Sequence, residues 1–518
     1  MSDTSRRFVC AAVAGLALST AFEPVALPWT IPFVVATFVL VTRGQRLRRA
    51  FLLGLVFGAA FYFVHIVWMR AVGIPAWIAL STLETLFYAG LASLTALLQR
   101  HRLWPLWFAS AWAAVEVLRS GWPLGGMPWG RLAFAVVDTP VAPALAYVGA
   151  VGVSFLLALL GALVAAILVG VRGPGSLRPP AFALVGLCAL IAIPVLVPWE
   201  TTGDGDRTLD LAVVQGDVPG DGDDILYDYR QVTQNHVDAT VDLAAQVARG
   251  EVAEPAFVLW PENSTATDPF DDAGTHAQII QASTAIGVPI LVGAIVDGGP
   301  NQVLNQGIVW DPETGAGERY TKRHPVPFGE YVPLRSVFLR YNFFDRLRDV
   351  GRDMLTGTRD EPLEVGGVPV ADAICFDIAY DDGITAQVSR GAELLVVQTS
   401  NATFIRTDQI DQQFAISRLR AIESGRWTAV ASTNGVSGVI APDGEVVEVA
   451  EPRTRTVLSQ QVVLTDSLTP ATRIGAWSGL LLCLLTLVGV VLAVGTGRTR
   501  TRTAEPPSAA EPELVGAR

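Results

Sequence analysis

The sequence predicts a polytopic α-helical membrane protein that carries a layered α/β domain outside the membrane. Two observations predict this fold class. Hydrophobic residues make up 51% of the 518 residues and the mean hydropathy is +0.41, which is too apolar for a soluble enzyme. The polar stretch 201–470 instead mixes short β-rich runs with helical ones, and it is long enough to bury a core of its own.

Eight apolar runs predict about eight membrane-spanning helices. They occupy residues 8–26, 29–42, 51–69, 74–98, 104–118, 141–170, 180–198 and 474–496. Seven of them precede the polar stretch and one follows it. We therefore expect a membrane domain in 1–200, a catalytic domain in 201–470, an eighth helix in 471–497 and a disordered cytoplasmic tail in 498–518.

Arginine placement predicts the orientation of these spans. Arginines cluster in alternate connections, at 6–7, 43–49, 100–102, 172–178 and 498–502, whereas the other connections hold only Arg70, Arg119 and Arg131. The positive-inside rule puts the clusters in the cytoplasm. An odd number of spans before residue 201 gives the same orientation. We therefore expect a multi-pass protein of the cytoplasmic membrane, with both termini cytoplasmic and residues 201–470 extracytoplasmic.

Charge within the predicted outer domain argues against one class of partner. Residues 201–470 hold 40 acidic and 19 basic side chains, whereas the first 200 residues hold 6 and 13. An acidic surface does not attract the phosphate backbone, so we expect no nucleic-acid partner.

Short β-rich runs and helical patterns predict the layers of the outer domain. The strand-like runs are 209–214, 256–260, 289–293, 371–376, 394–398, 427–432 and 436–440, and the helical stretches include 228–249 and 408–425. Turn signals at 434–435 and 442–444 predict hairpins. The sequence shows neither a phosphate-binding glycine motif nor a metal-ligand cluster, so we expect no cofactor and no metal.

Three polar residues stand at or beside the ends of apolar strand-like runs, where layered α/β folds place their sites. Glu262 follows 258–261, and Cys375 follows 371–374. Lys322 is the only lysine in the chain, among 36 arginines. A thiol nucleophile needs a base for its proton and a cation or donor for the oxyanion that forms. Glutamate, cysteine and lysine satisfy that requirement together, although each alone is more often structural.

In the order Glu, Lys, Cys, these residues resemble the catalytic triad of the carbon–nitrogen hydrolase (nitrilase) superfamily, whose fold is a four-layer α-β-β-α sandwich. Longer segments resemble the membrane-embedded apolipoprotein N-acyltransferase family. They are WPENS at 260–264, YTKRHPVPFGEYVP at 320–333, ICFD at 374–377, QFAISRLRAIE at 413–423, STNG at 432–435, EVLR at 116–119 and GGMPWG at 125–130. The resemblance covers nearly the whole chain except the tail.

The resemblance implies roles for these residues. Glu262 is expected to be the general base, Lys322 the cation beside the oxyanion, and Cys375 the nucleophile. Glu330 is expected to position Lys322 or help the oxyanion, with Phe376 and Asp377 in supporting positions. The implied reaction moves an acyl chain from a membrane phospholipid through a Cys375 thioester to the α-amine of a diacylglyceryl-cysteine on an apolipoprotein. We expect the working protein to be a monomer.

The sequence also departs from the family pattern. Phe376 replaces a common tyrosine, Asp377 replaces a common glutamate, and 403–405 reads Thr-Phe-Ile where Trp-Phe-Gly is usual. His324 is a tempting base for the thiol, but we expect it to be structural. Trp122 and Trp129 fit either a site near the interface or ordinary aromatic anchoring.

Two other functions stay open at this level. The chain fits a membrane-anchored amidase of the nitrilase type that acts on a small extracytoplasmic amide. It also fits a binding or scaffold protein with a relic triad, although an intact set of Glu262, Lys322 and Cys375 argues against that.

Overall fold

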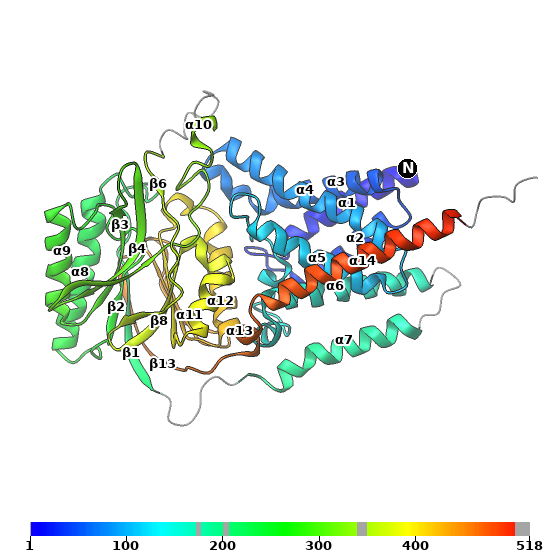
Figure 1. The fold of residues 1–518 in the computed structure, drawn as a ribbon. Coiled ribbons are helices and arrows are strands. Elements are labelled where there is room, and N and C mark those ends of the chain that lie inside the picture. Colours follow the sequence, from blue (N-terminus) through cyan, green and yellow to red (C-terminus); the bar gives the residue numbers. More distant parts are fainter. Residues whose placement is uncertain (1, 172–177, 200–206, 339–349, 503–518) are drawn as a thin grey trace, which may run out of the picture.

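A computed structural model describes residues 2–171, 178–199, 207–338 and 350–502. A bundle of long helices packs end-on against an α/β domain (Figure 1). The bundle contains α1 (Asp3–Ser19), α2 (Ile31–Thr42), α3 (Leu47–His65), α4 (Ile74–Leu98), α5 (Trp104–Gly121), α6 (Leu145–Val171), α7 (Arg178–Leu196) and α14 (Trp477–Arg502). Each predicted apolar run falls on one of these helices.

Five of these helices are long and apolar enough to cross a membrane, among the residues that the structure describes. They are α3, α4, α6 with the short turn before it, α7 and α14. The apolar helix that ends at Thr42 is shorter than a full span, and neither α1 nor α5 reaches the same length and hydropathy. The coarse prediction of a helical membrane part is thus supported, whereas the count of eight spans remains a prediction.

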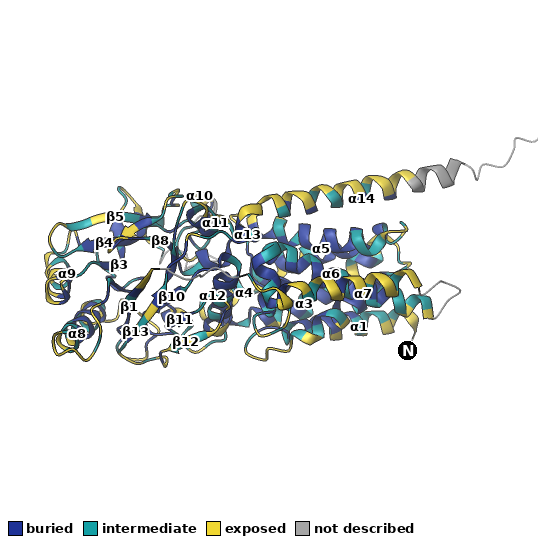
Figure 2. Cartoon of the chain, turned by 90° about the horizontal axis from the view of Figure 1, so that it is seen from below, coloured by how far each residue is buried: buried dark blue, intermediate teal, exposed yellow. Residues whose placement is uncertain are grey.

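The outward faces of the bundle suit lipid. Along α14 the side chains of Leu480, Leu484, Leu487 and Val491 are all more than half exposed, and Figure 2 shows α14 as a largely exposed helix. A helix that exposes apolar residues on this scale needs an apolar solvent. α14 also continues to Arg502, five residues into the stretch 498–518 that was predicted as a tail. The rest of that tail lies outside the described residues.

The α/β domain has four layers. One sheet has the order β13-β1-β2-β3-β4-β5, with β6 beside β4, and the other has the order β12-β11-β10-β9-β8-β7. Helices α8 and α9 cover the outer face of the first sheet, and α11 and α12 cover the second on the side of the bundle (Figure 1). The helices are α8 (Tyr229–Ala248), α9 (Ala273–Ile286), α10 (Arg335–Phe338), α11 (Asp382–Ser389), α12 (Gln409–Ser424) and α13 (Pro470–Ile474).

The strands explain why polar residues gather at one edge. They are β1 (Thr208–Gln215), β2 (Phe257–Leu259), β3 (Ile290–Asp297), β4 (Gln302–Asp311), β5 (Gly315–Thr321), β6 (Asp353–Met354), β7 (Leu363–Val365), β8 (Val368–Ile374), β9 (Leu394–Thr399), β10 (Thr428–Ser432), β11 (Gly438–Ile440), β12 (Val446–Val449) and β13 (Thr456–Val463). The central strands β1–β2–β3 and β8–β9–β10 pair in parallel. Their carboxyl ends therefore meet at the same edge.

One predicted strand ends earlier than expected. The run 371–376 was predicted to be extended throughout, but β8 ends at Ile374 and a 3₁₀ turn, η6 (Cys375–Ala379), begins there. The reason is the backbone of Cys375, whose φ of 52° is incompatible with a strand. The seven predicted strand-like runs otherwise coincide with β1, β2, β3, β8, β9, β10 and β11. β4, β5 and β13 were not predicted because polar residues interrupt their apolar pattern.

The domain is joined to the bundle by a shared core and by a partly buried ion pair. One hydrophobic cluster contains Trp112 and Trp129 of the bundle together with Leu419 and Ile422 of α12. Beside it, Arg131 donates two hydrogen bonds to Asp381, of 2.7 and 2.8 Å.

The same ion-pair cluster supports the turn that carries Cys375. Arg420 of α12 bonds to Asp381 and also donates to the carbonyls of Ile378 and Ala379 in η6. Arg131 of the bundle and Arg420 of α12 therefore meet at Asp381, next to η6, and Arg420 also holds η6 itself.

This junction leads to a prediction about stability. Replacing Arg131 by Ala should lower the free energy of unfolding by about 1.5–3 kcal/mol, because charge-assisted hydrogen bonds from a side chain that is 3% exposed are lost. Denaturant titration in detergent measures the change. Arg352→Ala is the control, since the Arg352–Asp297 pair is about half exposed and should contribute less than about 1 kcal/mol. Equal losses in the two variants would contradict the structural role of Arg131.

Candidate active site

Glu262 lies just beyond the end of β2 and is 3% exposed. Its turn packs closely on β3, where Gly293 leaves room: a Cβ there would lie 2.1 Å from the carbonyl oxygen of Pro261. One carboxylate oxygen accepts from Lys322 Nζ at 3.1 Å and from Asn305 Nδ2 at 2.7 Å. The other oxygen accepts from the backbone N–H of Ser400 at 2.9 Å. The carboxylate is therefore fixed on both sides.

Lys322 follows β5 and its side chain is fully buried. Its backbone is fixed from both sides, because its N–H donates to the carbonyl of Asn305 and its carbonyl accepts from Gly357. The ammonium donates to Glu262 at 3.1 Å and to Glu330 at 2.6 Å. Burial alone would lower the pKa of Lys322, but these two carboxylates raise the pKa well above its usual range. The ammonium thus remains charged.

Glu330 supports the lysine from the loop that follows it. Its second carboxylate oxygen accepts from the backbone N–H of Val326 at 2.9 Å, which orients the group toward Lys322. Burial raises the pKa of Glu330 above its usual value, although the lysine opposes that shift. The structure therefore brings Glu330 to Lys322, as the sequence predicted.

Cys375 stands on the tight turn after β8, with its backbone in the left-handed region. A non-glycine residue holds such a conformation only where its surroundings impose it, and active sites are a common place for it. Burial and the charge of Glu262 raise the pKa of Cys375 to about 12, against the opposing effect of Lys322. The resting thiol is therefore protonated and needs a base when it attacks, and Glu262 is the neighbouring carboxylate.

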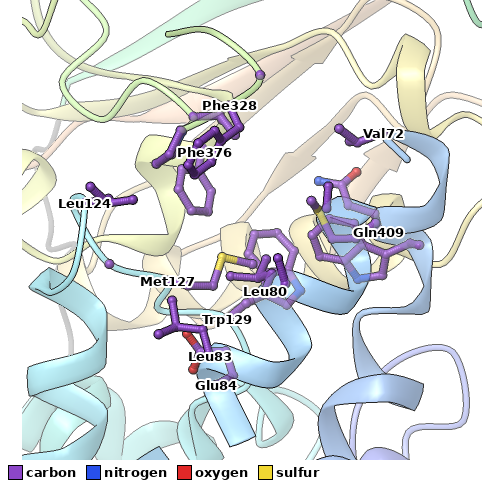
Figure 3. Close-up of a pocket in the computed structure, with 18 of the residues that line it drawn as sticks. Val72, Leu80, Leu83, Glu84, Leu124, Met127, Trp129, Phe328, Phe376 and Gln409 are labelled. Atoms are coloured by element: carbon purple, nitrogen blue, oxygen red, sulfur yellow. The ribbon is translucent and has the colours of Figure 1, made fainter. Parts of the chain in front are cut away.

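Figure 3 shows an apolar cavity of about 390 Å³. Cys375 is one of the residues that line it. The walls of the cavity come from both parts of the molecule. The bundle contributes Trp68 and Met69, one face of α4 and the loop 123–129, and the α/β domain contributes 326–329, Cys375, Phe376 and Phe404. Among the described lining residues, Glu84 is the only charged one. A cavity of this composition accommodates a hydrocarbon chain far better than a polar substrate.

Phe376 and Trp129 join the two parts at the cavity wall. Their rings stack with centroids 6.3 Å apart, and Trp129 also donates from Nε1 to Gln412 of α12 at 2.7 Å. Trp129 is only 2% exposed, so it is not an aromatic anchor at the bilayer surface, whereas Trp122 is 61% exposed and fits that role. The two tryptophans therefore have different surroundings.

Asp377 supports the site from behind. Its carboxylate accepts from the Tyr320 hydroxyl and from the backbone N–H groups of Arg323 and His324, at 3.0, 3.1 and 2.7 Å. Asp377 is not among the residues that line the cavity. It ties the lysine segment to the nucleophile turn, and protein donors occupy its oxygens.

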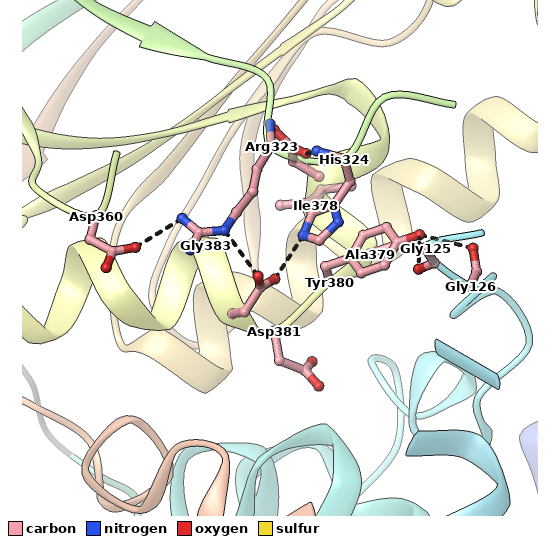
Figure 4. Close-up of polar contacts among 12 residues, drawn as sticks. Gly125, Gly126, Arg323, His324, Asp360, Ile378, Ala379, Tyr380, Asp381 and Gly383 are labelled. Atoms are coloured by element: carbon pink, nitrogen blue, oxygen red, sulfur yellow. Dashed lines mark hydrogen bonds and ion pairs between the residues drawn. The ribbon is translucent and has the colours of Figure 1, made fainter. Parts of the chain in front are cut away.

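His324 belongs to a second link between the lysine segment and the bundle (Figure 4). Its ring stacks on Tyr380 at 3.7 Å, and its Nε2 lies 2.8 Å from Asp382. The Tyr380 hydroxyl in turn donates to the carbonyls of Gly125 and Gly126. These contacts agree with the structural role expected for His324.

Sequence reasoning missed several residues that hold the site. Asn305 and the backbone of Ser400 fix Glu262, and Gln412 accepts from both Trp68 and Trp129. The one available signal was the Asn305-Gln306 pair inside an otherwise apolar stretch. Within the described residues no group of His, Cys, Asp or Glu is arranged to hold a metal ion.

The arrangement is suited to covalent acyl chemistry. Glu262 can take the thiol proton, Cys375 can attack a carbonyl carbon, and Lys322 can stabilise the oxyanion that forms. The neighbouring apolar cavity can accommodate the hydrocarbon chain of an acyl group.

The raised pKa of Cys375 predicts its reactivity. In a variant with Cys10, Cys188 and Cys483 replaced by Ala, alkylation by iodoacetamide should accelerate about tenfold per pH unit from pH 7 to 10 without levelling off, because the thiolate fraction keeps rising. Intact mass spectrometry follows the reaction. The unfolded protein should level off near pH 9, where an ordinary thiol is mostly ionised. A similar plateau in the folded protein would contradict the buried, protonated thiol.

Comparisons with known proteins find matches for both parts of the chain. Residues 14–163 match the family described as apolipoprotein N-acyltransferase N-terminal domain, and residues 211–467 match carbon-nitrogen hydrolase. An amidase structure from Nesterenkonia sp. is 18% identical, covers 53% of this chain and 95% of its own, and has a TM-score of 0.37.

Relatives that match most of the chain show which family it belongs to. An apolipoprotein N-acyltransferase of Mycolicibacterium smegmatis is 36% identical over 92% of this chain and 83% of its own length. One from Chromobacterium violaceum is 28% identical over 90% of both chains. The chain belongs to the apolipoprotein N-acyltransferase family, with a membrane-helix part and a carbon–nitrogen hydrolase domain.

Proposed function

We propose that this protein transfers an acyl chain from a membrane phospholipid to the N-terminal α-amine of a diacylglyceryl-cysteine on an apolipoprotein. The family assignment supports lipoprotein N-acylation. The observation that carries the mechanism is the apolar cavity that joins Cys375 to the membrane helices. A lipid acyl chain can enter such a cavity from the membrane without being exposed to water, which would be unfavourable.

The first half-reaction forms a thioester. Glu262 takes the proton from Cys375 as the sulfur attacks the ester carbonyl of the phospholipid, and Lys322 faces the developing oxyanion. The tetrahedral intermediate then collapses: the ester C–O bond breaks, and the released alkoxide takes the proton from Glu262. The products are an acyl-Cys375 thioester and a lysophospholipid.

The second half-reaction regenerates the enzyme. After the lysophospholipid leaves, the α-amine of the diacylated cysteine attacks the thioester carbonyl and passes a proton to Glu262. The C–S bond breaks, an amide forms, and the sulfur recovers its proton. A thioester is activated toward amines, and the two bulky lipids use one cavity in turn, so a ping-pong order follows.

We also propose the orientation of the chain in the cytoplasmic membrane. The arginine-rich connections 43–49 and 100–102 lie at the end of the bundle away from the α/β domain, where α14 also ends (Figure 1). The positive-inside rule therefore favours cytoplasmic termini, eight spans and an extracytoplasmic domain 201–470. Glu262, Lys322, Cys375 and the cavity all come from one chain, so a monomer suffices.

The alternative of a small-amide hydrolase fits the cavity poorly. A small amide needs polar partners beside the thiol, whereas the lining side chains are apolar apart from Glu84 and Gln409. The same apolar lining would also keep water away from the thioester, so that hydrolysis competes poorly with transfer to the amine.

One experiment tests the proposed reaction. Purified protein is incubated with phospholipid, with or without a diacylated lipopeptide, and intact mass spectrometry follows both protein and peptide. We expect an acyl adduct on Cys375 without peptide, and one additional acyl chain on the peptide amine when it is present. Cys375→Ala should show neither. Folded wild-type protein that gives no adduct and no peptide shift would refute the proposal.

Lys322→Arg tests the shape of the cation as well as its charge. The guanidinium keeps the charge but is a planar fork, and it does not fit between Glu262 and Glu330 at the observed 3.1 and 2.6 Å. We expect acyl-enzyme formation to fall at least about 100-fold, measured by the rate of adduct appearance. An exposed Arg352→Lys substitution should leave the rate unchanged. A Lys322→Arg rate within a few-fold of wild type would show that charge alone suffices.

A further inference from the structure

The cavity beside Cys375 runs along a single face of one helix. Six residues of α4 line it, in three adjacent pairs that repeat every four residues, as on one helical face: Pro75 and Ala76, Ala79 and Leu80, Leu83 and Glu84. Nine residues of helix rise by about 13 Å, so the cavity reaches deep into the bundle. Figure 3 shows Leu83 and Glu84 at the end of the lining opposite Phe328 and Phe376. The cavity thus has a thiol end and a far end.

The far end is polar and fixed. Glu84 is 1% exposed, and its carboxylate lies 3.4 Å from Nη1 of Arg119, which is fully buried. Arg119 cannot move away easily, because the same nitrogen donates to the carbonyls of Met127 and Trp129 at 2.7 and 2.8 Å. Met127 and Trp129 themselves form part of the cavity wall. The Glu84–Arg119 ion pair is therefore anchored to the cavity wall and closes the far end of the cavity.

We propose that Glu84 is the end stop of the acyl cavity and sets the length of the chain that Cys375 accepts. Each methylene that enters the apolar face of α4 adds favourable burial. A chain long enough to reach Glu84 gains nothing further, because it would have to displace or desolvate a buried ion pair. The inference rests on the proposed acyl transfer and adds a specificity-determining residue to it.

The test is a competition among donors. Wild-type protein and variants are incubated, without lipopeptide, with an equimolar mixture of phospholipids whose acyl chains differ in two-carbon steps. Intact mass spectrometry reads the adduct masses on Cys375 from one sample. We expect the wild-type profile to fall steeply above one chain length, since the chain then meets Glu84.

Two variants should move that profile in opposite directions. Glu84→Ala opens the far end, so adducts two carbons longer than the wild-type optimum should gain about tenfold relative to it. Leu83→Phe fills the far end and keeps the ion pair, so the optimum should move to shorter chains even if Glu84→Ala fails to fold. Leu86→Ala is the control, because Leu86 lies on the same helix, is 47% exposed and is outside the lining. It should keep the wild-type profile.

The outcomes separate the two proposals. No adduct on wild-type Cys375 with any donor would refute the acyl transfer itself. Wild-type adducts together with an unshifted profile in folded Leu83→Phe, or in folded Glu84→Ala, would refute the end stop and leave the acyl transfer standing.

Discussion

The site depends on one buried ammonium held between two carboxylates. Lys322 follows β5, Glu262 follows β2, and Glu330 lies in the loop beyond the lysine, so their contacts fix three segments of the chain at once. A lysine fully removed from water is stable only when such partners compensate it. Glu262 and Glu330 carry two negative charges against the one positive charge of Lys322. The excess negative charge and burial together raise the pKa of Cys375, so the resting thiol is protonated. The thiol therefore needs a base in order to act as a nucleophile.

A second constraint is that the site has walls from both parts of the molecule. Arg131 of the bundle pairs with Asp381 beside the nucleophile turn, which Arg420 of α12 supports from the domain side. Tyr380 contacts the loop at Gly125, and Trp129 packs on Phe376. The thiol thus faces hydrocarbon on the membrane side and charge on the domain side. An acyl ester has the same division, with an apolar chain attached to a polar carbonyl, which explains why a carbon–nitrogen hydrolase domain on a membrane bundle acts on lipids.

Glu262 and Cys375 could be singled out from the sequence because each follows an apolar strand-like run. Lys322 follows β5, which polar residues interrupt, so Lys322 and its neighbour Glu330 were expected from the resemblance of the segment 320–333 to the family. The sequence could not predict Asn305 or the Ser400 N–H, since an amide inside a strand and a backbone donor carry no distinctive pattern. The cavity could not be predicted either, because the alanines and leucines of α4 that line it are typical of any membrane-spanning helix. Asp377 was expected in a supporting position, and only the fold reveals that the backbone N–H groups of Arg323 and His324 donate to its oxygens.

Because Lys322 is the only lysine, selective ¹⁵N labelling of lysine gives a single side-chain signal, and its titration tests the central interaction directly. The ammonium between Glu262 and Glu330 should keep the chemical shift of the charged form up to pH 10.5, the usual pKa of a lysine, because its own pKa lies well above that value. In a Glu262→Gln, Glu330→Gln double variant the signal should titrate at lower pH, since burial then acts without compensation. A wild-type signal that titrates at or below pH 10.5 would contradict the paired, charged lysine on which the site is built.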